Sequence, residues 1–437
     1  MFSQIFFTRS LLTAGLVLLI TSAVSTSAAE TVRSDAGKML SSSRLVAEVL
    51  AKNPNLPAMQ AAWEAATARI KQVSALDDPT LAYLVAPATA DDSRTDFGQQ
   101  VELAQTLPWP GTLRLRGEAA RHEAEAAREE ITGVRLKLIN AATARAAQWA
   151  FVHEALAINR ANRKLLEGFR AIAVSRYSTG YASQQDALRA DVEVNLLRHQ
   201  QIVLERQRRE IAARINTLLN QPPDDVLPPP AELDEPPQPA DVKTLHRQAR
   251  RLRPELKALA ARTKALEARA GLAERAYFPD LTLKAGYNTL WDRDSKRFSV
   301  GVGITLPLDQ GKRRAAEDEA RARIRQNEWA WRDQAARIGE EVQLAYDQLQ
   351  ESRHTLALYR DSLVPLAEQD LAAALADYQA GIGDFLDLIT SEKNLLQTRL
   401  QRVRALADLQ IRFAELKRAV GTVQSRSDVD DSGGDAR

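Results

Sequence analysis

The feature that most constrains this fold is a polar turn that occurs twice, about 200 residues apart. The stretches RYSTGYASQQDAL and DYQAGIGDFLDLI share one skeleton. The aligned pairs are Tyr177 and Tyr378, Gly180 and Gly381, and Asp186 and Asp387. Other landmarks keep nearly the same offset, including Pro54 with Pro254. A constant offset over most of a chain indicates that a whole structural unit was duplicated.

The duplication divides the chain into segments. Arg9, a short apolar run and small residues before Glu30 predict a signal peptide over 1–29, and therefore an exported protein. The first repeat is predicted over 30–220 and the second over 241–421. Between them, residues 221–240 contain eight prolines and predict an extended linker. Residues 422–437 lack apolar periodicity and predict a disordered tail.

Long helices are predicted in each repeat. In the second repeat they run roughly over Val242–Tyr277, Lys312–Tyr378 and Asp384–Val420, and the middle one would measure about 100 Å. Pro365 is predicted to kink it. Its apolar residues step mostly by four and three, which indicates a coiled-coil seam. The seam consists of Trp331, Ala335, Ile338, Val342, Ala345, Leu349, Leu356, Tyr359, Leu363 and Leu366.

Two strands are predicted before the long helix of each repeat, over about 80–107 and 281–307. Apolar residues alternate with polar residues or glycine, less cleanly in the first repeat, and polar loops around 91–95 and 292–296 join the strands. In the second repeat the apolar face consists of Leu281, Leu283, Ala285, Tyr287 and Trp291, then Phe298, Val300, Val302, Ile304 and Leu306.

Such alternation is typical of transmembrane strands, but also of a small soluble sheet that covers a helical bundle. The export signal, with no second apolar run long enough for a transmembrane helix, favours membrane strands. Because a barrel needs about eight strands, four strands per chain require an oligomer.

No catalytic, metal or cofactor site is predicted, and an enzyme is the least favoured class. The chain has no Cys, and its five histidines lie scattered without partners at ligand spacing. The 59 basic and 57 acidic residues are interspersed, which argues against a nucleic-acid partner.

Local physics accounts for both turns. Gly180 and Gly381 suit the left-handed conformation that ends a helix. Ser183 and Asp384 are good N-caps. Asp186 and Asp387 then stand at the third helical position, where a carboxylate bonds back to the cap and meets the positive end of the helix dipole. The turns therefore predict two αα-hairpins.

The duplicated unit, strand pairs, long helices, Pro-rich segment and paired Tyr-x-x-Gly-(x)5-Asp turns together resemble TolC-like outer-membrane efflux channels, the outer-membrane factors of tripartite efflux systems. LPWPGTLRLRG, residues 107–117, is similar to the strand-to-helix junction of the heavy-metal-efflux branch. The resemblance implies a mainly α fold with a small β part. Three chains would form a 12-stranded β-barrel, continued by an α-helical periplasmic tunnel.

The function implied is a passive exit duct in the outer membrane of a Gram-negative bacterium, with a large periplasmic part. The partners implied are a homotrimer, outer-membrane lipid, a periplasmic adaptor and an inner-membrane pump of the resistance-nodulation-division type. The competing interpretation is a soluble periplasmic coiled-coil scaffold or adaptor, in which the strands cap a bundle.

The resemblance also implies that the turns are periplasmic tips, where the adaptor docks and the tunnel narrows. The site residues expected are Tyr177, Gly180, Tyr181, Ser183 and Asp186, with Tyr378, Gly381, Ile382, Asp384 and Asp387. Their carboxylates would favour cations. Some members of the family close the tip with an Arg where this chain has Gly383, and Arg176 or Arg189 are candidates to replace it.

Overall fold

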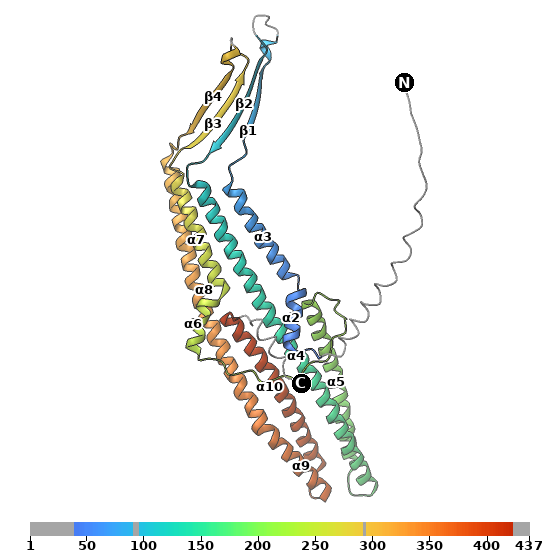
Figure 1. Ribbon diagram of the computed structural model, residues 1–437. Helices are drawn as coiled ribbons and strands as arrows, with labels where there is room; N and C mark the ends of the chain where they lie inside the picture. Colours follow the sequence, from blue (N-terminus) through green and yellow to red (C-terminus); the bar gives the residue numbers. More distant parts are fainter. Residues whose placement is uncertain (1–38, 91–95, 292–293, 423–437) are drawn as a thin grey trace, which may run out of the picture.

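The computed structural model describes residues 39–90, 96–291 and 294–422, and these form an elongated molecule with a sheet at one end and helices below it (Figure 1). The predicted signal peptide, the tail beyond residue 422 and parts of both strand-connecting loops lie outside the described residues.

The two repeats present the same order of elements. The first contains α2 (Ser42–Lys52), α3 (Asn55–Ser74), β1 (Thr80–Ala86), β2 (Gly98–Leu107), α4 (Thr112–Ser178) and α5 (Gln184–Leu218). The second contains α6 (Val242–Leu252), α7 (Pro254–Arg275), β3 (Asp280–Asn288), β4 (Phe298–Thr305), α8 (Gln310–Leu358), α9 (Val364–Ala380) and α10 (Phe385–Val420). The predicted fold class, mainly α with a small β part in a duplicated unit, is confirmed.

The helix predicted over Val242–Tyr277 is in fact two helices, broken at Arg253. Pro254 explains the break, because a proline disfavours the helical conformation of the residue before it. Arg253 is extended, with ψ 120°. Asn53, before Pro54, is extended in the same way with ψ 125°, so the break recurs in the first repeat.

At each break, a buried polar side chain bonds to the end of the last helix of the same repeat. Asn53 donates from Nδ2 to the carbonyl of Leu218 at 2.9 Å, near the end of α5. Arg253 donates from Nη1 to the carbonyl of Ala419 at 3.0 Å, near the end of α10, and also forms an ion pair with Glu341 at 2.8 Å. In both repeats, therefore, the residue before the proline connects the start of the repeat to its last helix by a side-chain hydrogen bond to a backbone carbonyl.

The four strands form one antiparallel sheet in the order β1-β2-β3-β4. Its apolar face is exposed over all four strands. Exposed on it are Leu81, Tyr83, Val85, Val101, Leu103, Leu281, Leu283, Tyr287, Phe298, Val300, Val302 and Ile304. On the opposite face, Lys284 pairs with Glu102 at 2.8 Å. The predicted alternation is confirmed, although Trp291 lies beyond the end of β3.

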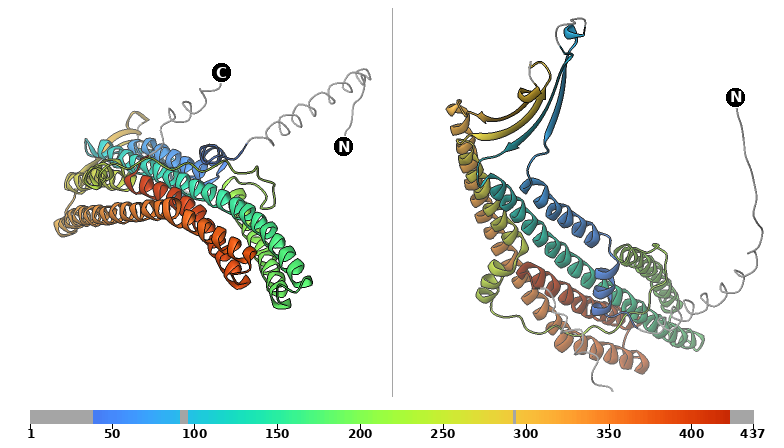
Figure 2. Two further views of the ribbon diagram at one scale, coloured as in Figure 1. Left: turned by 90° about the horizontal axis from the view of Figure 1, so that it is seen from below. Right: turned by 45° about the horizontal axis from the view of Figure 1, so that its top comes forward.

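The helices continue the strands as a curved layer (Figure 2). Below the sheet, α3 packs on α4, α4 on α7 and α7 on α8. Toward the far end, α5 packs on α4, α4 on α10, and α10 on α8 and α9. One lateral edge is therefore formed by β1, α3 and α5, and the other by β4, α8 and α9. Within the described parts of the chain, no helix is long and apolar enough to cross a bilayer.

The predicted seam is confirmed in its centre, where Ala335, Ile338, Val342, Ala345, Leu349 and Leu356 are buried. Trp331 and Leu366, at its ends, are exposed. At Pro365 the α-helical ladder is interrupted by a five-residue π turn, Tyr359–Leu363, which separates α8 from α9. The proline lacks the N–H that the regular ladder requires, and the π turn shifts the bonding around it.

Candidate functional site: the tips of the two helical hairpins

The two predicted turns lie at the ends of the helical hairpins farthest from the sheet (Figure 1). Hairpin 1 consists of α4 and α5, and hairpin 2 consists of α9 and α10. Their facing sides share one apolar cluster. It contains Leu166, Phe169, Ala173, Ala190, Val194, Leu197, Leu371, Tyr378, Phe385, Leu388, Ile389, Leu395 and Leu396. The tips are therefore held against each other within a single chain.

The turn of hairpin 1 combines a glycine stop with a capped start. Gly180 has a φ of +82°, and its N–H donates to the carbonyl of Tyr177 at 3.0 Å. Ser183 is the N-cap of α5 and forms a capping box with Asp186, whose Oδ2 accepts the Ser183 N–H at 3.4 Å. This satisfies N–H groups that the helix start leaves without helical partners.

The turn of hairpin 2 has the same backbone but a different cap. Gly381 has a φ of +82°, and Ile382 donates to the carbonyl of Asp377 at 3.1 Å. Asp384 is the N-cap of α10, but its side chain accepts no hydrogen bond from the first turn, so the expected side-chain cap is absent. Asp387 stands in that turn, and repulsion between two carboxylates so close together disfavours a shared capping box.

At Gly383 the backbone leaves no room for a side chain. A Cβ at this position would lie 2.9 Å from the Asp377 Cβ and 3.2 Å from the Tyr378 nitrogen. The tight approach of this turn to the end of α9 thus requires glycine. Position 383 therefore offers no side chain that could link the tips.

Arg176 forms that link. Its Nη1 donates to the carbonyl of Tyr378, and its guanidinium carbon lies 4.8 Å from the centroid of the Tyr378 ring. A cation placed over a carbonyl at a helix C-terminus is stabilised by the helix dipole as well as by the ring. Arg176 therefore joins the end of α4 to the end of α9.

Tyr378 is the buried anchor of this contact, with 4% of its surface exposed. Burial raises the pKa of its hydroxyl, the nearby Asp186 carboxylate raises it further, and Arg176 lowers it. The hydroxyl oxygen has no hydrogen-bond partner among the described residues. Tyr378 thus packs the two hairpins together, while Tyr177, its counterpart in the first repeat, is exposed.

Each tip exposes a large apolar side chain. Tyr181 is 78% exposed and Ile382 is 81% exposed. Asp384 and Asp387 are also exposed, and Asp186 is half-buried. The structure therefore brings the expected site residues to one end of the molecule, where all of them except Tyr378 reach the surface at least in part.

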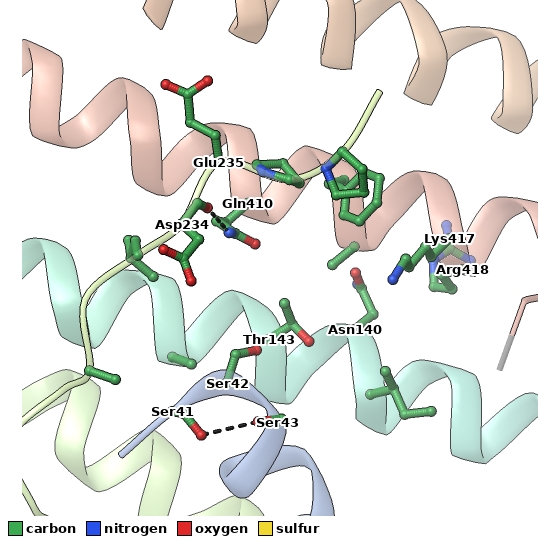
Figure 3. A pocket seen from close by; sticks show the side chains of 18 of the residues that line it. Ser41, Ser42, Ser43, Asn140, Thr143, Asp234, Glu235, Gln410, Lys417 and Arg418 are labelled. Atoms are coloured by element: carbon green, nitrogen blue, oxygen red, sulfur yellow. Dashed lines mark hydrogen bonds between the residues drawn. The ribbon is translucent and has the colours of Figure 1, made fainter. Parts of the chain in front are cut away.

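A pocket of about 390 Å³ opens far from the tips, where the Pro-rich linker crosses α4 and α10 (Figure 3). Lys417 lies over the Phe413 ring at 4.7 Å, and Arg418 pairs with Glu341 at 3.6 Å. Gln410 donates to the carbonyl of Asp234 in the linker. The first two contacts lie within and between helices, and the third joins the linker to α10, so the tips remain the stronger candidate site. Within the described residues, no cluster of His, Cys, Asp or Glu is arranged to hold a metal ion.

A duplicated helical hairpin with a four-stranded sheet at one end and paired tips at the other is the architecture of the outer-membrane efflux channels. The sequence profile described as "Outer membrane efflux protein" matches residues 45–221 and 245–422. The chain belongs to this family. The members of this family are channel proteins, so the assignment confirms the predicted class, an outer-membrane efflux channel.

Individual relatives agree with this assignment. The cobalt-zinc-cadmium resistance protein CzcC of Cupriavidus metallidurans is 26% identical over 157 residues, which is 35% of this chain and 36% of that protein. The matched region thus spans about a third of this curated relative.

Solved structures show the same fold. CusC, described in a study of conformational changes accompanying folding and transmembrane channel formation, aligns with a TM-score of 0.76 at 19% identity, over 87% of this chain and 92% of that one. The outer-membrane channel OprN aligns with a TM-score of 0.74 at 22% identity, over 87% and 89%.

The link through Arg176 was only one of two alternatives that the sequence left open. Its position in the first repeat corresponds to Asp377 in the second, so the repeat pattern gives no signal for a basic residue there. Only the lateral packing of the hairpins places it over Tyr378.

Replacing Arg176 should loosen the tips. Arg176→Gln removes a charged hydrogen bond and a cation–π contact, together worth roughly 1.5 kcal/mol, or about tenfold in the local opening equilibrium. Hydrogen exchange over the peptide that spans the α9–α10 turn should become about tenfold faster. Arg198→Gln, an exposed change on α5, is the matched control. Equal exchange in both variants would contradict the link.

Proposed function

We propose that three copies of this chain form the outer-membrane exit duct of a tripartite efflux system, which receives its substrate from an inner-membrane pump through a periplasmic adaptor. The observation that carries the proposal is the open-edged, curved layer of the single chain, in which the sheet exposes its whole apolar face.

The sheet needs partners at its edges and on its face. Within the described chain, β1 and β4 each have one unpaired edge, and such edges invite a further strand. Val300 is 76% exposed, and its neighbours on that face are exposed as well, which suits contact with lipid. Three copies supply twelve strands, enough to close a barrel that four strands cannot close.

The helical edges support the same assembly. Upper α8 packs on α7 but leaves its outer side exposed, including Trp329. On the opposite edge, α3 packs on α4 and is otherwise mostly exposed. These edges would meet around a closed ring and extend the barrel as a tunnel. A soluble scaffold would leave the apolar face of the sheet uncovered, so the alternative is disfavoured.

At the tips, Tyr181 and Ile382 are the proposed adaptor contacts, because they are the most exposed apolar side chains there. Asp186, Asp384 and Asp387 are proposed to rim the entrance of the pore. With three copies, each contributes a ring of negative charge, which favours cations. The name of the relative CzcC points to divalent metal cations as the cargo.

The trimer is tested by fractionating cells. The chain should be found in the outer membrane as a trimer that dissociates on heating. Val300→Arg, on the lipid side, should destabilise the barrel in the membrane by roughly 2–4 kcal/mol and reduce the amount of assembled trimer. Thr282→Arg, on the opposite face, is the matched control and should assemble. A wild-type chain found only as a soluble monomer would rule out the channel.

Adaptor docking is tested by cross-linking through introduced cysteines. Because the chain has no cysteine of its own, no native thiol can form a competing cross-link. Ile382→Ser combined with Tyr181→Ser should reduce cross-linking to the adaptor at least tenfold, since exposed apolar anchors carry much of an interface. Val226→Ser, at an even more exposed apolar residue in the linker, is the control. Unchanged cross-linking with intact trimers would assign docking to another surface.

Charge selectivity is tested in planar bilayers. Asp387→Asn removes a carboxylate that takes no part in a capping box, so the preference for cations over anions should fall while the trimer remains. Asp370→Asn, an exposed acid on α9 away from the turn, should retain it. A wild-type preference in Asp387→Asn would exclude this residue from the pore entrance.

A further inference from the structure

A buried carboxyl group lies in the contact between the two hairpins. Glu392 is on α10, two turns after the tip, and is 1% exposed. The other large side chains that are fully buried among the described residues are all aliphatic. Leu388 and Leu396, four residues before and after Glu392, share its face of the helix and are buried too. The carboxyl group is therefore enclosed by the apolar cluster that joins the hairpins.

Only one of the two oxygens of this carboxyl group has a hydrogen-bond partner among the described residues. Its Oε1 accepts a hydrogen bond from Nδ2 of Asn162 on α4, and this bond crosses from hairpin 2 to hairpin 1. Its Oε2 is buried and has no partner among the described residues. An ionised carboxylate in such surroundings carries a large desolvation cost, whereas a neutral carboxylic acid carries much less.

The charges around the group do not offset this cost. Burial raises the pKa of Glu392 to about 7, Glu193 of α5 raises it as well, and Lys393 opposes them. Lys393 is itself paired with Glu193 at 3.0 Å. The charged residues that flank the contact on α4, α5 and α9 are engaged elsewhere: Arg163 with Glu167, Arg170 with Asp191, and Glu368 with Arg399. On α9, Asp370 and Asp377 are exposed.

We propose that Glu392 makes the contact between the hairpins respond to pH: the neutral acid holds α10 against α4, and its ionisation weakens that hold. The contact belongs to a single chain, so this inference stands whether or not three copies form a channel. If they do, the tips would part more readily in neutral or alkaline surroundings than in acid.

The direction follows from proton binding. When the hairpins separate, Glu392 meets water and its pKa returns toward the ordinary 4.5, whereas in the closed contact it is about 7. Between these values the closed state binds more protons than the open state. The closed contact therefore loses stability as the pH rises through this window, and the loss levels off above about pH 8.

The test compares hydrogen exchange of the full chain and of Glu392→Gln in detergent, over peptides from α10 at pH 5 to 8.5. Glutamine keeps an acceptor for Asn162 and stays neutral, and the intrinsic pH dependence of exchange cancels in the ratio of the two rates. The ratio of wild type to variant should rise more than tenfold between pH 5 and 7 and level off above about pH 8. A ratio that stays constant over this range would overturn the proposal.

Two further variants and one spectrum exclude a merely structural effect. Glu193→Gln should move the rise to lower pH, because it removes a charge that raises the pKa of Glu392. Glu368→Gln, in an exposed pair with Arg399, should leave the rise unchanged. Infrared difference spectra of wild type minus Glu392→Gln should show a protonated carboxyl C=O band at pH 5 that disappears by pH 8. Absence of the band at pH 5 would also overturn the proposal.

Discussion

The rest of the structure depends on the side-by-side packing around α4. This one helix of 67 residues touches α3 and α7 below the sheet, and α5 and α10 toward the tips. Because an α-helix rises about 1.5 Å per residue, α4 reaches roughly 100 Å, and along this length it packs between helices of the first repeat and helices of the second. The packing of α4 on α7 also explains the strand order. Because β2 leads directly into α4 and β3 follows α7, these two strands lie side by side and pair.

In such a layer the inner helices and strands pack or pair on both sides, whereas those at the two edges have a neighbour on one side only. Small residues such as Ala142, Ala146 and Ala155 let neighbouring helices approach α4 closely. Within the described residues the sheet has no strand beyond β1 or β4, while α3 packs on α4 alone and upper α8 packs on α7. The incompleteness of the single chain is thus a direct result of its packing, and it motivates the proposed trimer.

The tips show how a duplicated sequence acquires different roles. Gly180 and Gly381 both adopt positive φ, because both helices must stop and reverse. Yet Tyr177 is exposed and Tyr378 is buried, since only Tyr378 faces the other hairpin and receives Arg176. Likewise the Ser183 turn is held by a capping box and the Asp384 turn is not. Local backbone chemistry was conserved between the copies in this chain, whereas the contacts across the hairpins diverged.

By itself, the sequence determined what depends on neighbours along the chain: the duplication, the alternating strands, the central seam and the two glycine stops. It missed the helix break before Pro254, where the proline disfavours the helical conformation of Arg253. Only the tertiary structure decided which side chains meet across the hairpins. Arg176 meets Tyr378, and Glu392 meets Asn162, 230 residues away in sequence. No local pattern encodes such contacts, because the lateral packing of α4 against α10 sets them.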